Sequence, residues 1–165
     1  MAERALRIRR VAGRTDAVAC ARMMVATEPW LTLGRTYDQA LATVRDPAHE
    51  VYVCDDDSGI RGFIVLVLGG AFVGYIKAVC VAPDARGGGI GTRLVRFAED
   101  RIGAVSPAVF LTVSSFNPRA QALYERLGFR VVGELPDFIV DGHSEILMRK
   151  QAVPWSRFVP REPTA

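Results

Sequence analysis

Between residues 81 and 94 the chain reads Val81-Ala82-Pro83-Asp84-Ala85-Arg86-Gly87-Gly88-Gly89-Ile90-Gly91-Thr92-Arg93-Leu94. An apolar strand pattern ends in this stretch and a helical pattern over residues 89–102 begins in it, which predicts a strand-to-helix turn. The consecutive glycines let a ligand approach the main chain with no Cβ in the way. The free N–H groups of the helix start, with the helix dipole behind them, form an anion site, and Arg86 adds a fixed positive charge. The stretch therefore predicts a diphosphate-binding loop.

Other glycine-rich loops fit this stretch less well. A P-loop needs a lysine directly after its glycines, and none follows here. A dinucleotide fingerprint needs an acidic residue at the end of the next strand, whereas that strand ends in Thr112-Val113-Ser114. A turn that merely packs a helix well is the remaining alternative. Gly89 and Gly91 each cost a helical first turn about 0.5–1 kcal/mol relative to alanine, which favours a ligand.

Working outward from the loop, periodicity and turn signals predict the order β-α-α-β-β-β-α-β-α-β-β. The strand-helix-strand passage over 76–113 implies a parallel pair joined by a right-handed crossover, and hairpins on either side imply antiparallel neighbours. The fold class is α/β (α+β), with a mixed, mostly antiparallel central sheet and helices on both faces. Expected strands are 6–11, 50–54, 60–68, 71–81, 108–113, 129–132 and 144–149, and expected helices are 17–26 with its N-cap at Thr15 or Asp16, 36–44, 89–102 and 118–127.

Length and composition set limits on organisation and partners. The 165 residues suit one domain over 1–150, with a proline-containing tail over 151–165. No apolar run approaches the roughly 20 residues of a membrane helix, and the N-terminus does not resemble a secretory signal. The three cysteines have neither metal-ligand nor disulfide-framework spacing, which predicts reduced thiols, no metal and a cytoplasmic protein. The net charge of +3 lacks the dense basic face of a nucleic-acid binder.

A second motif covers residues 117–129, Asn-Pro-Arg-Ala-Gln-Ala-Leu-Tyr-Glu-Arg-Leu-Gly-Phe. Asn117 is a good N-cap, Pro118 suits the first helical position and Gly128 a helix stop. Asn117, Ala120 and Tyr124 then share one helix face, and the small alanine leaves room for a ligand there. On the residues alone, a cap with a core alanine and a core tyrosine explains the motif slightly better.

Taken together, the two motifs resemble those of the GNAT superfamily of acyl-CoA N-acyltransferases. Arg86-x-x-Gly89-x-Gly91, flanked by Val81-x-Pro83 and Leu94, is similar to the family's acetyl-CoA signature. The pattern N-x-x-A-x-x-x-Y-x-x-x-G-F is similar to its second motif, in the family's order and separation. The specific matches cover 79–94 and 117–129, and the element order agrees over about 5–150.

This resemblance implies a site for acetyl-CoA, used as a co-substrate. Tyr124 would lie near the thioester sulfur and donate to the leaving thiolate. Asn117 would contact the pantetheine or phosphate arm. The main chain of Val79, Cys80 and Val81 would hold the pantetheine like an added strand. The pyrophosphate would lie on the main chain of Arg86, Gly87, Gly88, Gly89, Ile90, Gly91 and Thr92.

The general base is the open part of the resemblance. Many relatives carry a glutamate on the strand before the loop or on the strand before the asparagine. Tyr75, Lys77 and Thr112 stand there in this chain. Glu28, in the Glu28-Pro29-Trp30 helix break, is the best substitute, because that loop lines the acceptor site in the family. A helix-terminal surface glutamate explains Glu28 equally well. His143 and Asp137 in the closing hairpin, or a water chain, are further alternatives.

The resemblance implies an N-acetyltransferase that acetylates a primary amine of a small molecule or a peptide N-terminus by direct attack. A non-catalytic acyl-CoA-binding or regulatory module is the alternative, and a donor such as succinyl-CoA would change only the acyl chain. Expected partners are an amine acceptor, no nucleic acid and no membrane, and a homodimer is compatible with the sequence.

Overall fold

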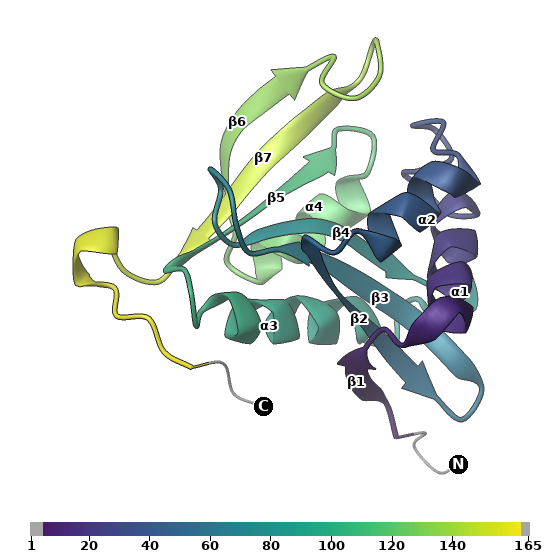
Figure 1. Ribbon diagram of the computed structural model, residues 1–165. Helices are drawn as coiled ribbons and strands as arrows, with labels where there is room; N and C mark the ends of the chain where they lie inside the picture. The colour runs from purple at the N-terminus through teal and green to yellow at the C-terminus, as the bar shows by residue number, and fades with distance from the viewer. Residues whose placement is uncertain (1–4, 163–165) are drawn as a thin grey trace. The chain divides into compact units, whose positions relative to one another are not determined.

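The computed structural model describes residues 5–162, which form seven strands and four α-helices (Figure 1). The strands are β1 (Arg7–Arg10), β2 (His49–Asp56), β3 (Gly59–Val67), β4 (Tyr75–Val81), β5 (Ala108–Ser114), β6 (Arg130–Pro136) and β7 (Ser144–Gln151). The helices are α1 (Gly13–Val25), α2 (Tyr37–Arg45), α3 (Ile90–Ile102) and α4 (Pro118–Arg126). The predicted element order is confirmed, as is the mixed, mostly antiparallel sheet with the strand order β1-β2-β3-β4-β5-β7-β6.

The start of α1 differs from the prediction. Its N-cap is Ala12, not Thr15 or Asp16, and the helix begins at Gly13. Asp16 acts from inside the first turn, where its Oδ2 accepts a hydrogen bond of 2.8 Å from the Ala12 N–H. The same carboxylate accepts a hydrogen bond from Arg9. An acidic residue in the first turn thus serves the exposed N–H groups that a capping side chain would otherwise serve.

The start of β4 is also later than predicted, at Tyr75 instead of Ala71. Gly74 has a φ of 87°, and a Cβ at this position would lie 2.6 Å from the Ala108 carbonyl oxygen. Only glycine fits both the conformation and the space. The apolar residues before Gly74 therefore lie in a bend outside the strand, although their composition predicts a strand.

Two compact units make up the chain, and each is described by itself. The first contains residues up to 66 and 78–96, with β1, β2, β3 and the second half of β4. Figure 1 shows α1 and α2 side by side over this part of the sheet. One face carries a core shared with α1 and α2, built from Ala17, Cys20, Ala21, Met24, Trp30, Ala40, Val44, Val51, Val53, Phe63, Val65, Ala78 and Cys80.

The opposite face of the same strands receives the beginning of α3. A Cβ on Gly62 of β3 would lie 3.1 Å from Ile90 and 3.3 Å from Leu94, which both project from α3. Residues 62 and 63 point to opposite faces because side chains alternate along a strand. Helices therefore cover both faces of this part of the sheet, as predicted.

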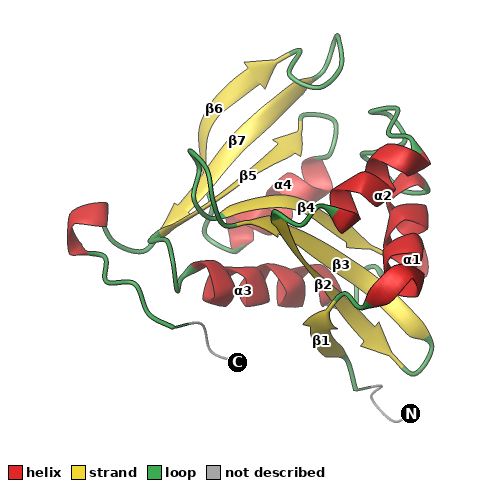
Figure 2. Cartoon of the chain, viewed as in Figure 1, coloured by secondary structure: helices red, strands yellow, loops and turns green. Residues whose placement is uncertain are grey.

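The second unit contains residues 67–77 and those from 97 on. Here β4 pairs in parallel with β5, Tyr75 opposite Phe110 and Ile76 opposite Leu111. β5 then pairs antiparallel with β7, and β7 with β6, which form the hairpin seen in Figure 2. Beyond β7, main-chain hydrogen bonds join Ala152 to Pro107 and Arg161 to Ala104. The predicted tail is thus held at two points against the 104–107 turn.

Candidate active site

The predicted diphosphate loop leaves β4 through a short 3₁₀ turn, Pro83–Ala85, and ends where α3 begins at Ile90. Gly87 and Gly89 have φ values of 84° and 78°. A Cβ on either would meet no heavy atom within 4 Å. Glycine is therefore required by the left-handed backbone and not by crowding, and the protein leaves open space beside the main chain. That is the local shape an anion at a helix start needs.

Charged side chains near the loop leave it net positive. Arg86 is exposed, and its Nε donates only a long 3.4 Å hydrogen bond to the Val81 carbonyl. Asp84 would oppose an anionic ligand, but Arg61 donates to its Oδ2 at 2.9 Å. This hydrogen bond holds the pKa of Asp84 below its ordinary value. The Arg61–Asp84 pair is formally neutral, so the charge of Arg86 is not offset by its nearest acidic neighbour in sequence.

The strand before the loop carries Val79, Cys80 and Val81, whose main chain is the predicted pantetheine site. Cys80 is 2% exposed, and its thiol lies 3.4 Å from the Thr27 hydroxyl. Burial raises the pKa of Cys80 to about 11. The nucleophilic thiolate is therefore almost absent at neutral pH, and Cys80 is a core thiol. No cysteine among the described residues forms a disulfide.

In the second unit, α4 is held at both ends by its own sequence. Asn117 is the N-cap, and its Oδ1 accepts a 3.2 Å hydrogen bond from the Ala120 N–H. At the other end the Gly128 N–H donates to Glu125 and the Phe129 N–H donates to Tyr124. These two bonds are a Schellman motif, which fixes the helix end. The predicted cap and stop are confirmed, and Tyr124 lies in the last turn that they hold.

The ring of Tyr124 is packed, whereas its hydroxyl has no hydrogen-bond partner among the described residues. It is 8% exposed, and its ring makes an edge contact with that of Phe129, at a centroid distance of 5.9 Å. Among residues 5–162 no group is hydrogen-bonded to the Tyr124 hydroxyl. Burial, with a smaller contribution from the charge of Tyr75, raises the pKa of Tyr124. The side chain therefore keeps its proton well above neutral pH and can act as a hydrogen-bond donor.

The predicted candidate bases have local partners. Glu28 is exposed, and its carboxylate accepts hydrogen bonds from the N–H and the hydroxyl of Thr32, at 3.2 and 3.1 Å. Asp137 has a φ of 51° and accepts a 2.7 Å hydrogen bond from the Gly142 N–H, which closes the β6–β7 loop. The His143 ring makes an edge contact with Phe116 at 4.8 Å. Glu28 belongs to the first unit and the other two to the second.

One acidic residue that the sequence reasoning missed is Glu145, in β7. It is 4% exposed and its Oε1 accepts a 2.5 Å hydrogen bond from the hydroxyl of Ser114 in β5. The register places the two residues directly opposite each other. The sequence does contain a signal for Glu145, because a charged residue stands at the second position of the mostly apolar strand Ser-Glu-Ile-Leu-Met.

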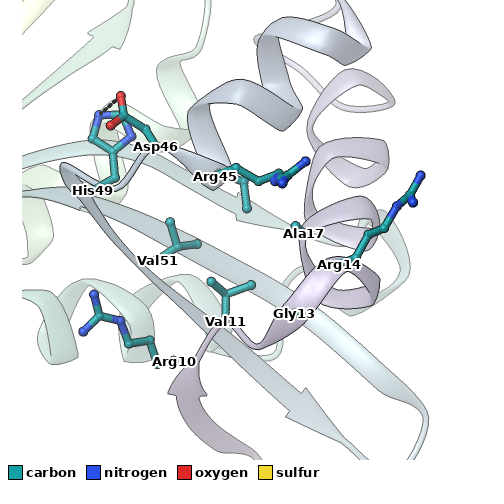
Figure 3. A pocket seen from close by; sticks show the side chains of 10 residues that line it. Arg10, Val11, Gly13, Arg14, Ala17, Arg45, Asp46, His49 and Val51 are labelled. Atoms are coloured by element: carbon teal, nitrogen blue, oxygen red, sulfur yellow. Dashed lines mark ion pairs between the residues drawn. The ribbon is translucent and has the colours of Figure 1, made fainter.

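A separate cavity of about 490 Å³ lies in the first unit (Figure 3). Its rim carries Arg10, Arg14 and Arg45, whose side chains point in different directions in Figure 3. At one side the Nε2 atom of His49 lies 3.7 Å from a carboxylate oxygen of Asp46. None of the predicted site residues lines this cavity. Within the described part of the chain there is no cluster of potential metal ligands, and no helix is long and apolar enough to cross a membrane.

Comparison with known proteins agrees with the two motifs. The model of the acetyltransferase (GNAT) family matches residues 15–129. The chain belongs to this family. The GNAT match includes the whole diphosphate loop and ends on Phe129, the last residue of the second motif. The structure describes the two motifs in different units, with the loop in the first and with Asn117 and Tyr124 in the second.

Individual GNAT relatives are more distant. An uncharacterised N-acetyltransferase of Methanocaldococcus jannaschii is 31% identical over 61% of this chain and 65% of its own length, so the chain spans just under two thirds of it. The blasticidin-S acetyltransferase of Streptomyces morookaense is 28% identical over 62% of this chain and 74% of its own length. Both carry acetyltransferase names.

Solved structures share the fold. A GNAT-family protein from Desulfovibrio desulfuricans superimposes with a TM-score of 0.77 over 90% of this chain and all of its own, at 20% identity. An aminoglycoside 6'-N-acetyltransferase complexed with coenzyme A superimposes with a TM-score of 0.71 over 89% of this chain and 97% of its own, at 19% identity. At these identities the likeness establishes the architecture alone.

Proposed function

We propose that this protein transfers an acetyl group from acetyl-CoA to a primary amine of a small molecule or of a peptide N-terminus. The observation that carries the proposal is the open, positively charged loop at the start of α3, with left-handed Gly87 and Gly89. A diphosphate is the ligand class that such a loop suits. Family membership points to coenzyme A as the molecule that carries this diphosphate, because coenzyme A is bound in a solved structure with the same fold.

Each part of the donor then has a proposed partner. The main chain of residues 86–92 binds the pyrophosphate, and the main chain of Val79–Val81 binds the pantetheine. Asn117 uses its Oδ1 for the helix cap, which leaves its side-chain NH₂ to donate to the pantetheine or phosphate arm. Tyr124 donates to the sulfur of the leaving thiolate.

Direct attack of the amine suits these groups better than an acyl-enzyme. Cys80 lies within the strand proposed to bind the pantetheine, and its raised pKa makes it a poor nucleophile. Tyr124 has a pKa above its ordinary value of about 10, whereas a free thiol has a pKa near 8.5. Full proton transfer from Tyr124 to the thiolate is therefore uphill. Its hydrogen bond stabilises the thiolate as the C–S bond breaks.

The proposal is tested by thiol release from acetyl-CoA with a panel of amines. The panel contains n-propylamine, a peptide with an N-terminal alanine, blasticidin S and an aminoglycoside. The last two are included because they appear in the names of two similar acetyltransferases. We expect acetyl-CoA to bind and at least one amine to accelerate thiol release. Binding without release by any amine would favour the alternative, a non-catalytic acyl-CoA-binding module. The absence of acetyl-CoA binding would contradict both.

Glu28 is the proposed base that converts the incoming ammonium into the free amine. An alkylammonium has a pKa near 10.4, so little free amine is present at pH 7. We expect the rate with n-propylamine to rise between pH 7 and 9. It should not fall in that range through loss of the Tyr124 proton, because the pKa of Tyr124 is raised.

Glu28→Gln keeps an oxygen that can accept from Thr32 and removes only the charge. We expect kcat with n-propylamine to fall by about 10²–10⁴-fold, the usual range for a lost acid or base. With methoxyamine, which is already a free base at pH 7, kcat should change little. Unchanged activity and an unchanged pH profile with n-propylamine would leave solvent-relayed deprotonation as the mechanism.

A further inference from the structure

Glu145, which is hydrogen-bonded to Ser114 in the second unit, is a buried ionisable residue that forms no ion pair within the described residues. Glu145 is 4% exposed and Ser114 is 2% exposed. The neighbour of Glu145 on β6 is Leu135, which offers no charge. Among residues 5–162 no basic side chain forms an ion pair with Glu145, and its only side-chain hydrogen bond is the one that the Ser114 hydroxyl donates to Oε1. The other carboxylate oxygen, Oε2, therefore has no hydrogen-bond donor among these residues.

Holding two strands in register does not require such a group. A carboxylate that is 4% exposed and has one neutral donor is costly, because it has lost most of its water and gained a single hydrogen bond. An apolar pair at positions 114 and 145 would hold the same register at a smaller cost, since β5 and β7 already pair over seven residues each. The position of Glu145 is therefore better explained by chemistry than by packing.

Other polar groups share this face of the sheet. Side chains two apart on a strand point the same way, so Thr112 and Ser114 project from one face of β5. The Tyr75 hydroxyl lies 2.9 Å from the Thr112 hydroxyl. Burial, and to a smaller extent the charge of Glu145, raises the pKa of Tyr75. Glu145 thus lies within electrostatic range of Tyr75, whose hydroxyl contacts Thr112 on the same face of β5 as Ser114.

We propose that Glu145 acts through Ser114 to take up the proton that the acceptor nitrogen releases during acetyl transfer. This inference rests on the proposed function. As the C–N bond forms, the nitrogen becomes cationic and must lose one proton. That proton moves to Ser114 Oγ, directly or through one water, while the Ser114 hydroxyl proton moves to Glu145 Oε1. The C–S bond breaks, and the thiolate is stabilised by Tyr124.

This role differs from that of Glu28. Glu28 removes a proton from an ammonium before attack, and Ser114 with Glu145 removes a second proton after attack. Ser114 is the contacting group, and Glu145 acts through it, because it orients the Ser114 hydroxyl and accepts its proton. Their burial keeps bulk water away, which strengthens the effect of the Glu145 charge on the hydroxyl.

The test compares Glu145→Gln, Ser114→Ala and the double variant, with Glu134→Gln as the matched control. Glutamine keeps the size of Glu145 and an oxygen that can accept from Ser114. Glu134 is an exposed glutamate of β6, in the strand next to β7. Three quantities are measured for each protein: the thermal midpoint of unfolding, the acetyl-CoA dissociation constant, and kcat with n-propylamine and with methoxyamine.

We expect each single variant to lower kcat by about 10²-fold with both amines, with an unchanged acetyl-CoA dissociation constant. The double variant should be no slower than the worse single variant, because the two residues act as one unit. The Glu134→Gln control should match the wild type. Loss of kcat with both amines separates this role from that of Glu28, whose loss should be confined to n-propylamine.

The inference would be overturned if folded Glu145→Gln had the kcat of the wild type, or if the losses of the two single variants added up in the double variant. The Ser114–Glu145 hydrogen bond would then only help to hold β5 and β7 in register. If Glu145→Gln does not fold, Ser114→Ala decides alone, and wild-type kcat in that variant overturns the inference. Failure of the wild type to release thiol with any amine would instead contradict the proposed function. The wild-type rate therefore tests the function, and the ratio of variant to wild type tests the Ser114–Glu145 pair.

Discussion

Gly89→Glu is expected to abolish acetyl-CoA binding. The substitution adds a carboxylate where the loop leaves open space beside the main chain. A negative charge there repels the pyrophosphate, and the side chain occupies its volume. Gly89 also has a φ of 78°, so any L-residue adds roughly 1–2 kcal/mol of backbone strain. Isothermal titration calorimetry with acetyl-CoA measures the effect, and we expect no detectable heat of binding.

Gly13→Glu is the matched control for this variant. Gly13 is also a left-handed glycine at a helix start, with a φ of 64° and open space around a built Cβ. The control therefore introduces the same side chain and similar strain, at the beginning of α1 instead of α3. Acetyl-CoA affinity should stay at the wild-type value in Gly13→Glu. Equal affinities in both variants would show that the α3 loop does not bind the pyrophosphate.

Tyr124→Phe is expected to lower kcat by about 10- to 1000-fold, the range for one lost donor to a leaving group. Acetyl-CoA affinity should change little, because the ring and its contact with Phe129 remain. The fold should also persist. The last turn of α4 is held by main-chain bonds from Gly128 and Phe129, and the hydroxyl has no hydrogen-bond partner among the described residues. Steady-state kinetics with a saturating amine measures kcat.

Tyr52→Phe controls for the loss of a tyrosine hydroxyl as such. The Tyr52 hydroxyl donates a 2.7 Å hydrogen bond to Glu50 within β2, and the sequence motifs give it no part in acetyl transfer. The kcat of the Tyr52→Phe variant should match that of the wild type. A wild-type kcat in Tyr124→Phe would show that Tyr124 serves only in packing. It would contradict the proposed stabilisation of the thiolate by the Tyr124 hydroxyl.

Local rules in the sequence account for most of the element order and for the helix ends near the site. Asn117 caps α4 and Gly128 stops it, as predicted from those residues alone. Thr36 was expected inside the helix 36–44, and in the structure it caps α2 and forms a capping box with Gln39. Each of these signals acts within about five residues of its position, so it can be recognised without knowing the rest of the fold.

Boundaries that depend on distant partners were predicted less well. The apolar residues before Gly74 predict a strand, yet β4 starts at Tyr75 because the Ala108 carbonyl lies too close for a Cβ at position 74. The start of α1 was also predicted wrongly, although there the partner is only four residues away: the Asp16 carboxylate serves the Ala12 N–H from inside the helix. Neither contact follows from periodicity, which records only how apolar residues alternate.

By itself the sequence determined the glycine loop, the α4 motif and the family, because each depends on residues close together in the chain. Only the tertiary structure decided where Glu145 lies. Its partner Ser114 is 31 residues away in the chain, and the two meet because β5 and β7 pair in one particular register. A shift of that register by one residue would turn Glu145 to the other face. A buried carboxylate next to a serine hydroxyl is therefore a consequence of strand pairing, which no local pattern in the sequence specifies.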